Sequence, residues 1–73
     1  MPTTSPDFKW CTARTEGIKR LVEAAEEAYS EGETEEVIAH LEVAEADARS
    51  LMLRLRETIK LLNADLHAEG GAA

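Results

Sequence analysis

The sequence predicts an all-α protein, an antiparallel helical hairpin that self-associates into a helical bundle. Apolar residues recur at steps of three and four along two segments, which is the period of an amphipathic helix. Gly32 separates these segments, and a glycine in that place favours a left-handed helix end. A chain of 73 residues with three aromatic residues has little surface to bury, so we expect a partner to complete its core.

The N-terminal arm or helix extension, residues 1–14, allows two interpretations. Ser5 can cap a helix that continues into the hairpin, with Pro6 at the first helical position. Alternatively, Thr15 caps a shorter helix, and the residues before it form an arm across the second helix. The arm fits better, because Arg14 and Gly17 suit a continuous buried stripe poorly.

The hairpin is expected over residues 15–69, with its turn near residues 30–34 and a flexible tail at 70–73. The first helix has an apolar face that ends at the turn. Its members are Ile18, Leu21, Val22, Ala25, Ala28 and Tyr29.

The second helix is expected to begin with Thr34 as its cap and to run to about Ala68, because neither glycine nor proline interrupts that segment. Its apolar face is predicted to contain Val37, Leu41, Ala44, Ala48, Leu51, Leu55, Ile59, Leu62 and Leu66. The shorter first helix cannot cover the far half of this face. We therefore expect an antiparallel four-helix bundle whose oligomer interface contains Leu51, Leu55, Ile59, Leu62 and Leu66.

The composition argues against several classes of protein. A net charge of −7 is unsuited to general nucleic-acid binding or to an anionic membrane surface. No apolar run is long enough to span a membrane, and the single Cys11 indicates a reducing compartment, so a soluble, cytoplasmic protein is expected. No spacing suits nucleophilic or acid–base catalysis, and the pair Glu36 and His40 is too small for a metal site. We expect no enzyme activity, cofactor or metal.

The cations are concentrated in two windows of the sequence. Residues 9–20 contain four cations and one acid, and residues 49–60 do so as well. Residues 21–48, between the windows, contain ten acids and neither Lys nor Arg. An antiparallel hairpin brings the two windows together, so the closed end is expected to be acidic and the open end basic.

The basic windows predict a site for a phosphate-bearing ligand. Guanidinium groups bind phosphate with two parallel hydrogen bonds, and an aromatic ring can stack a base. The predicted ligand-binding residues are Trp10, Arg14, Lys19, Arg49, Arg54 and Arg56. The alternative is that helical ion pairs, such as Glu45 with Arg49, or a neighbouring subunit, balance this charge.

Two stretches resemble the phage-encoded hairpin proteins that sequester cyclic oligonucleotides and so blunt CBASS defence. The stretch "PDFKW" is similar to the arm of that family, and "HLEVAEADARSLMLR" is similar to its second helix. Cys11 stands where the arm has a histidine, and Asp47 and Arg49 replace an aromatic residue and an asparagine. The resemblance implies a helical-hairpin oligomer with ligand pockets between subunits.

Two functions are therefore expected for a small regulatory protein. The first is a hairpin oligomer that sequesters a phosphate-bearing ligand such as a cyclic oligonucleotide. The alternative is an acidic helical adaptor or inhibitor that binds another protein through its helix faces.

Overall fold

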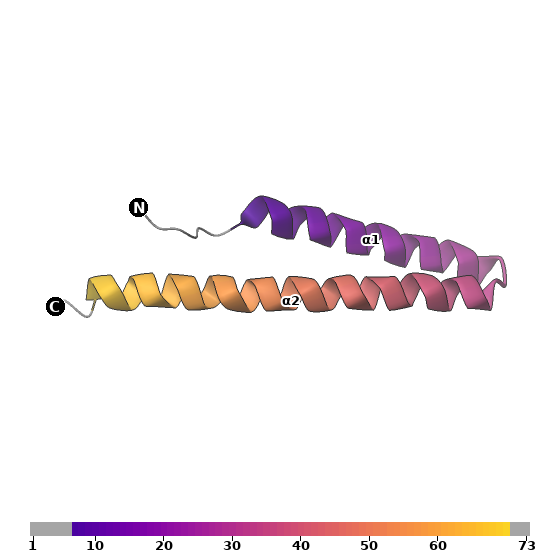
Figure 1. The fold of residues 1–73 in the computed structure, drawn as a ribbon. Helices are drawn as coiled ribbons and strands as arrows, with labels where there is room; N and C mark the ends of the chain where they lie inside the picture. The colour runs from indigo at the N-terminus through magenta and orange to yellow at the C-terminus, as the bar shows by residue number, and fades with distance from the viewer. Residues whose placement is uncertain (1–6, 71–73) are drawn as a thin grey trace.

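A computed structural model describes residues 7–70 of the chain, with side chains described up to residue 67. It contains two helices, α1 (Phe8–Ser30) and α2 (Thr34–Gly70), which lie side by side as a hairpin (Figure 1). The hairpin is a rod of 61 × 16 × 16 Å. The predicted all-α hairpin is confirmed. Gly70 is the last helical residue, and the rest of the predicted tail lies outside the described residues.

The N-cap of helix α1 lies eight residues before Thr15, the cap that we favoured from the sequence. Asp7 is its N-cap, and its Oδ1 accepts a hydrogen bond from the Trp10 backbone N–H at 3.0 Å. The Thr15 hydroxyl donates to the carbonyl of Cys11 at 2.8 Å inside the helix, so Thr15 caps nothing. The arm is therefore wrong for residues 8–14, which form a helix extension. The helix is capped by the carboxylate of Asp7. Ser5, the cap predicted for the helix extension, lies outside the described residues.

The turn closes with hydrogen bonds that satisfy the end of α1. The backbone N–H of Glu33 donates to Ala28 O at 2.9 Å, and that of Gly32 donates to Tyr29 O at 3.1 Å. This pair of hydrogen bonds requires a residue with positive φ after the helix. Gly32 has φ 76°, as predicted. The Glu33 carbonyl accepts from Val37 N, so Thr34 is the first helical residue and does not cap α2.

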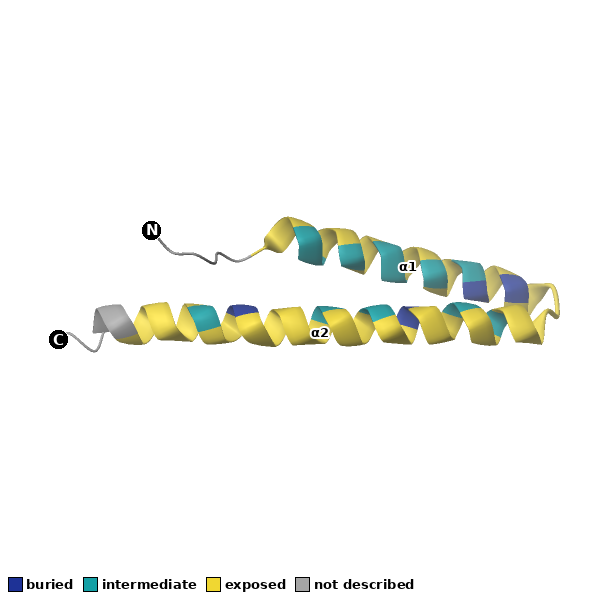
Figure 2. Ribbon diagram, viewed as in Figure 1, coloured by how far each residue is buried: buried dark blue, intermediate teal, exposed yellow. Residues whose placement is uncertain are grey.

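The two helices face each other along narrow stripes of buried and half-buried residues (Figure 2). On α1 the centre of this stripe contains Trp10, Arg14, Gly17, Leu21, Ala24 and Ala28, and Cys11, Ile18 and Ala25 flank it on one side. On α2 it contains Val37, His40, Ala44, Asp47, Leu51, Thr58 and Leu61. The central residues follow steps of three and four, except for a step of seven between Leu51 and Thr58, and many of them are small or polar.

The apolar face predicted for α2 is wrong in part, because it merged two neighbouring stripes. Val37, Ala44 and Leu51 do lie on the side of α2 that faces α1. The other predicted members, Leu41, Ala48, Leu55, Ile59, Leu62 and Leu66, are exposed one position further around the helix. Periodicity alone cannot separate two stripes that differ by one residue, since both follow the same spacing.

The hairpin has a thin core. The buried hydrophobic residues in the described part of the chain are Ala25, Ala28 and Ala44, and none of its large side chains is fully buried. One buried methyl group contributes only about 0.8 kcal/mol. Thr58, which is also buried, donates its hydroxyl hydrogen to the Arg54 carbonyl at 2.9 Å. Most of the large apolar side chains therefore remain exposed to solvent in the single hairpin.

Candidate functional site

A polar cluster lies where the N-terminal part of α1 meets the middle of α2. The half-buried Trp10 ring has the Arg14 Cζ atom 4.8 Å from its centroid and the Arg54 Cζ atom 4.9 Å from it. Both distances are typical of cation–π contacts. Because one arginine comes from each helix, the ring links the two helices.

An ion pair between the helices lies beside this ring. Arg14 Nη1 donates to Asp47 Oδ1 at 3.0 Å, and the two side chains are 35% and 26% exposed. The partial burial makes this contact stronger than an ordinary surface pair. The ion pair also balances the charge of Arg14. Arg14 can therefore lie on the half-buried stripe of α1, because Asp47 lies opposite it on α2.

The structure brings together only half of the predicted ligand-binding residues. Trp10, Arg14 and Arg54 lie in the polar cluster, where they contact one another. Arg49 donates to Glu45 Oε2 at 3.3 Å on the exposed surface of α2, as the alternative of internal ion pairs predicted. The other two predicted residues, Lys19 and Arg56, are exposed outside the cluster.

Two shallow hollows flank the cluster, and each includes a carboxylate. One has a volume of about 170 Å³ and is lined by Trp10, Ala13, Arg14, Gly17 and Asp47. The other has a volume of about 350 Å³ and is lined by Trp10, Ser50, Leu53, Arg54 and Glu57. Asp47 and Glu57 oppose the binding of an anion at these places.

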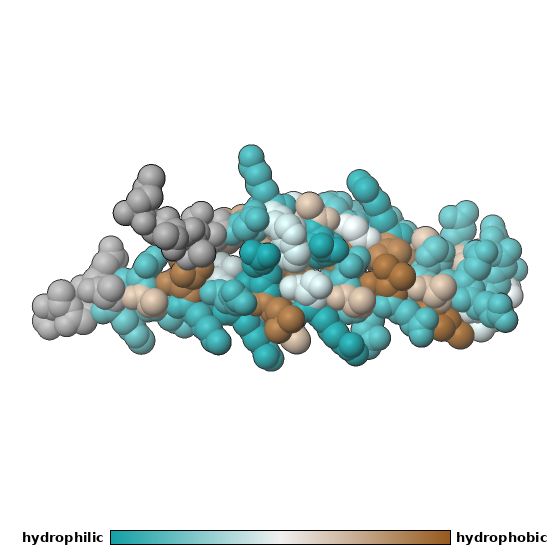
Figure 3. All heavy atoms as spheres, in the orientation of Figure 1, coloured by the Kyte–Doolittle hydropathy of each residue, from teal (hydrophilic) through white to brown (hydrophobic). Residues whose placement is uncertain are grey.

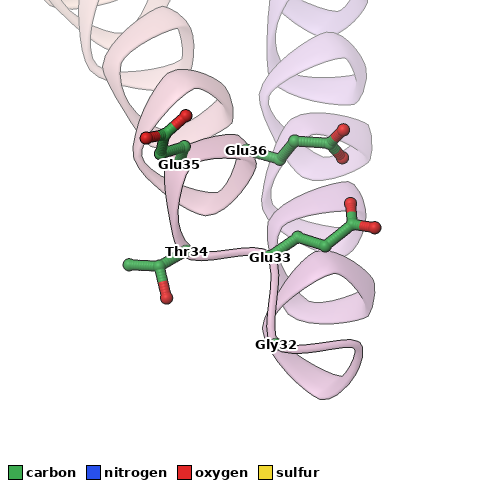
Figure 4. A pocket seen from close by; sticks show the side chains of 5 residues that line it. All are labelled: Gly32, Glu33, Thr34, Glu35 and Glu36. Carbon is green, nitrogen blue, oxygen red and sulfur yellow. The ribbon is translucent and has the colours of Figure 1, made fainter.

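A third hollow, of about 370 Å³, lies at the turn and is lined by residues 32–36. The carboxylates of Glu33 and Glu36 point to the same side there (Figure 4). A side-chain hydrogen bond with Glu36, and then repulsion from its charge, raise the pKa of Glu33 above its ordinary value of 4.5. The closed end of the rod is acidic, as the charge distribution predicted.

The most extensive surface feature is an apolar stripe along α2, which we call the α2 stripe. Its large side chains are between 44% and 63% exposed. The α2 stripe contains Ile38, Leu41, Ala48, Met52, Leu55, Ile59, Leu62 and Leu66. Four of the five residues predicted for the oligomer interface belong to it. The fifth, Leu51, is half-buried on the side that faces α1.

A shorter stripe on α1 lies on the same side of the rod. We call it the α1 stripe, and it contains Phe8, Cys11, Ile18, Val22 and Tyr29, of which Cys11 and Ile18 are half-buried. Ala25, which has the same spacing, is buried in the hairpin. The residues of the α1 and α2 stripes come one position after residues that face the other helix. One position along an α-helix corresponds to a right-handed rotation of about 100° around the helix axis. Because the helices are antiparallel, equal rotations turn both stripes toward one face. We call this face, made of the α1 and α2 stripes, the apolar face.

The remaining surface is more hydrophilic. On the side of the rod drawn in Figure 3, the hydrophobic side chains stand apart from one another among hydrophilic ones. Val43 and Leu53 are 51% and 57% exposed, and they lie outside the α2 stripe. They are therefore suitable positions for control substitutions.

Two contacts were missed by the sequence-based prediction. Asp47 was treated as part of an acidic surface, and Arg54 was not placed on Trp10. A signal for the first was present, because a charged residue on a buried stripe needs an opposite charge on the facing helix. No comparable signal marks the second contact, which depends on the twist of one helix about the other.

Within residues 7–70, neither helix has the length and apolar character needed to cross a membrane. The same part of the chain has no group of three His, Cys, Asp or Glu side chains placed to hold a metal ion. No family model, curated protein or solved structure matches the chain.

Proposed function

We propose that this protein is a non-enzymatic interaction module that self-associates through its apolar face into a helical bundle. The assembled hairpins then present their acidic outer surfaces to another protein, as an adaptor or inhibitor does. The observation that carries this proposal is the exposed α2 stripe. A monomer with such a continuous apolar surface is costly in water, and covering it is the usual role of a partner helix.

The exposed area is large enough for a stable interface. The large side chains of the α2 stripe leave on the order of 650 Å² open per protomer, close to the roughly 800 Å² that each partner gives to a standard interface. Phe8, Val22 and Tyr29 on the α1 stripe, which are 64%, 49% and 78% exposed, add to this area.

The dimensions of the hairpin also favour association. Its accessible surface of 6013 Å² exceeds the roughly 4,500 Å² that a compact monomer of 8.0 kDa has. The radius of gyration is 17.7 Å, against about 11 Å for a globular chain of this length. The excess of about 1,500 Å² is larger than the roughly 800 Å² that a standard interface covers on each partner.

Substitutions on the α2 stripe test this proposal. The double variant Leu55→Gln/Ile59→Gln should weaken self-association by at least a hundredfold, because each lost aliphatic contact costs about 1.5–3 kcal/mol. Sedimentation equilibrium measures the mass across a concentration series, and circular dichroism checks that the helices remain.

The matched control is Val43→Gln/Leu53→Gln, which removes two aliphatic side chains of similar exposure outside the stripe. It should associate like the unaltered protein. A monomeric unaltered protein at high micromolar concentration, or equal weakening by both variants, would overturn the proposal.

Sequestration of a phosphate-bearing ligand, such as a cyclic oligonucleotide, is the second candidate function. It is favoured by Arg54, which lies on Trp10 without an acid within ion-pair distance among residues 7–67. An anion that reached this guanidinium would also contact the aromatic ring. Asp47 and Glu57 beside it make this function the weaker candidate.

A thermal-shift titration with cyclic di- and trinucleotides tests the second candidate. A ligand that binds the folded protein raises the melting temperature, and Arg54→Gln should abolish the rise. A lack of any rise, or a rise that persists in Arg54→Gln, excludes this arginine as the ligand site.

A further inference from the structure

The α2 stripe has the spacing of a coiled-coil seam. Its residues alternate in steps of three and four from Ile38 to Leu66, a seven-residue repeat in which Glu45 is the one polar member. A seam of this type fits a second helix with the same repeat, and α2 of another copy has that repeat. This pattern raises the question of how two copies are oriented.

We propose that two copies pair with opposite orientation, so that α2 packs on α2 of the second copy and the turn of each hairpin lies at the open end of the other. This inference rests on the proposed self-association and specifies its geometry. A two-fold axis then crosses the apolar face between Ala48 and Met52. Three independent features of the chain favour this arrangement.

The first feature is the length of α1. If both turns lay at the same end, the apolar faces could meet only with α2 on α1 of the second copy. Helix α1 begins at Phe8, and the contact between Trp10 and Arg54 shows that this start lies beside the middle of α2. The α2 stripe beyond Leu55 would then stay uncovered. Opposite orientation covers it with the second α2.

The second feature is the charge along the rod. The ten acids of residues 21–48 occupy the closed end, and the basic windows, residues 9–20 and 49–60, lie toward the open end. Opposite orientation places each acidic end beside the basic windows of the other copy. Equal orientation would place twenty acids together, and like charges that face each other are destabilising.

The third feature is the register of the seam. With the axis between Ala48 and Met52, Ile38 faces Leu62 of the second copy, and Leu41 faces its Ile59. Small Ala48 faces large Met52, so the layer at the axis is complementary in size. Glu42 then lies beside Arg56 of the second copy at the solvent-exposed rim. The same register places Arg49 near Arg49 of the second copy at the axis, where each arginine is already paired with its own Glu45 at 3.3 Å.

The same axis also brings the two α1 helices together. The ion pair between Arg14 and Asp47 sets the level of α1 against α2. The axis lies about three residues beyond Asp47 on α2, so it passes near Cys11, three residues before Arg14 on the antiparallel α1. Phe8 then lies beside Thr15 of the second copy, and this contact would cover an aromatic side chain that is 64% exposed in the hairpin. The contact between the α1 helices is short, and α2 supplies most of the interface.

Disulfide cross-linking in solution tests the orientation. The native thiol is removed by Cys11→Ser, and Glu42→Cys or Arg56→Cys is added to that background. Under mild oxidation the mixture of the two variants should give the mixed disulfide dimer as its main product, whereas each variant alone should remain largely unlinked. Both positions are exposed, so the hairpin should tolerate the changes.

The outcomes separate this inference from the proposed function. A variant that cross-links mainly with itself would overturn the inference, because neither position 42 nor position 56 lies near its own copy across the proposed axis, although self-association would stand. A dimer by sedimentation with no cross-link in the mixture would overturn it as well. A monomer in sedimentation would overturn both proposals.

Charge exchange gives a second, non-covalent readout. Glu42→Arg and Arg56→Glu should each weaken the dimer on the order of threefold to tenfold, because each creates two like-charge contacts at the rim. The double variant Glu42→Arg/Arg56→Glu should restore the original dissociation constant. Additive weakening in the double variant would contradict the proposed register.

Discussion

Gly17 and Gly32 differ in backbone conformation. Gly32 has φ 76°, which a side chain with a Cβ atom adopts at a cost, whereas Gly17 is an interior residue of α1 with no positive φ. A Cβ atom built on Gly17 meets nothing within 4 Å. The turn therefore needs its glycine, and the helix does not.

Substitution of these two glycines by alanine should have opposite effects on stability. Gly17→Ala should raise the free energy of unfolding by about 0.5–1 kcal/mol, because alanine loses less backbone entropy in a helix. Gly32→Ala should lower it by about 1 kcal/mol or more, because the left-handed conformation is strained with a Cβ. Urea unfolding followed by circular dichroism measures both. A Gly17→Ala variant less stable than the unaltered protein would indicate a hidden steric contact at that position.

At the scale of the helices, the sequence predicted most of the fold. The spacing of apolar residues and the glycine at the turn located both helices, and the end of α1 was correct. The start of α1 was predicted wrongly, because Arg14 was judged unfit for a buried stripe. Its partner Asp47 lies 33 residues away, and a contact at that separation is not visible in local periodicity.

The candidate site was less predictable than the fold. Trp10, Arg14 and Arg54 were chosen for their chemistry, and they do lie together, but their mutual contacts use the groups that a ligand would need. The apolar residues of α2 were recognised, whereas their division into two stripes was not. That division depends on the rotation of α2 about its axis, which the packing against α1 sets.

Glu45 offers a test of the seam at the same scale. It is the one polar member of the seven-residue repeat, and its side chain is 65% exposed beside Arg49. Glu45→Leu should tighten the dimer about tenfold or more, because a carboxylate at the seam is replaced by an aliphatic side chain. Sedimentation or dilution calorimetry measures the change. Glu42→Leu, at the rim, is the control and should not tighten the dimer; a similar gain from both variants would place the seam elsewhere.

At the scale of the whole molecule, the rod shape makes the mode of pairing visible in solution scattering. Two rods that overlap along their length, with helix axes 8–10 Å apart, should have a radius of gyration only about 1 Å above the 17.7 Å of the hairpin. The scattering mass should nevertheless double from 8.0 kDa. Rods joined end to end, with their centres about 61 Å apart, would instead give roughly 35 Å. Small-angle X-ray scattering over a dilution series distinguishes these cases, with Leu55→Gln/Ile59→Gln as the monomeric reference.

The tight turn at Gly32 also has a consequence for the order in which the hairpin forms. The helices are joined through only three residues, so contacts beside the turn close a short loop, whereas the contact between Arg14 and Asp47 closes a loop of more than thirty residues. Loop-closure entropy rises with length, and short-range contacts form first in helical proteins. Pairing should therefore start beside the turn, between the last turn of α1 at Ala28 and the first turn of α2 at Val37, and proceed away from it. Trp10, the one tryptophan of the chain, is reached last, so its fluorescence should report the final step of hairpin closure.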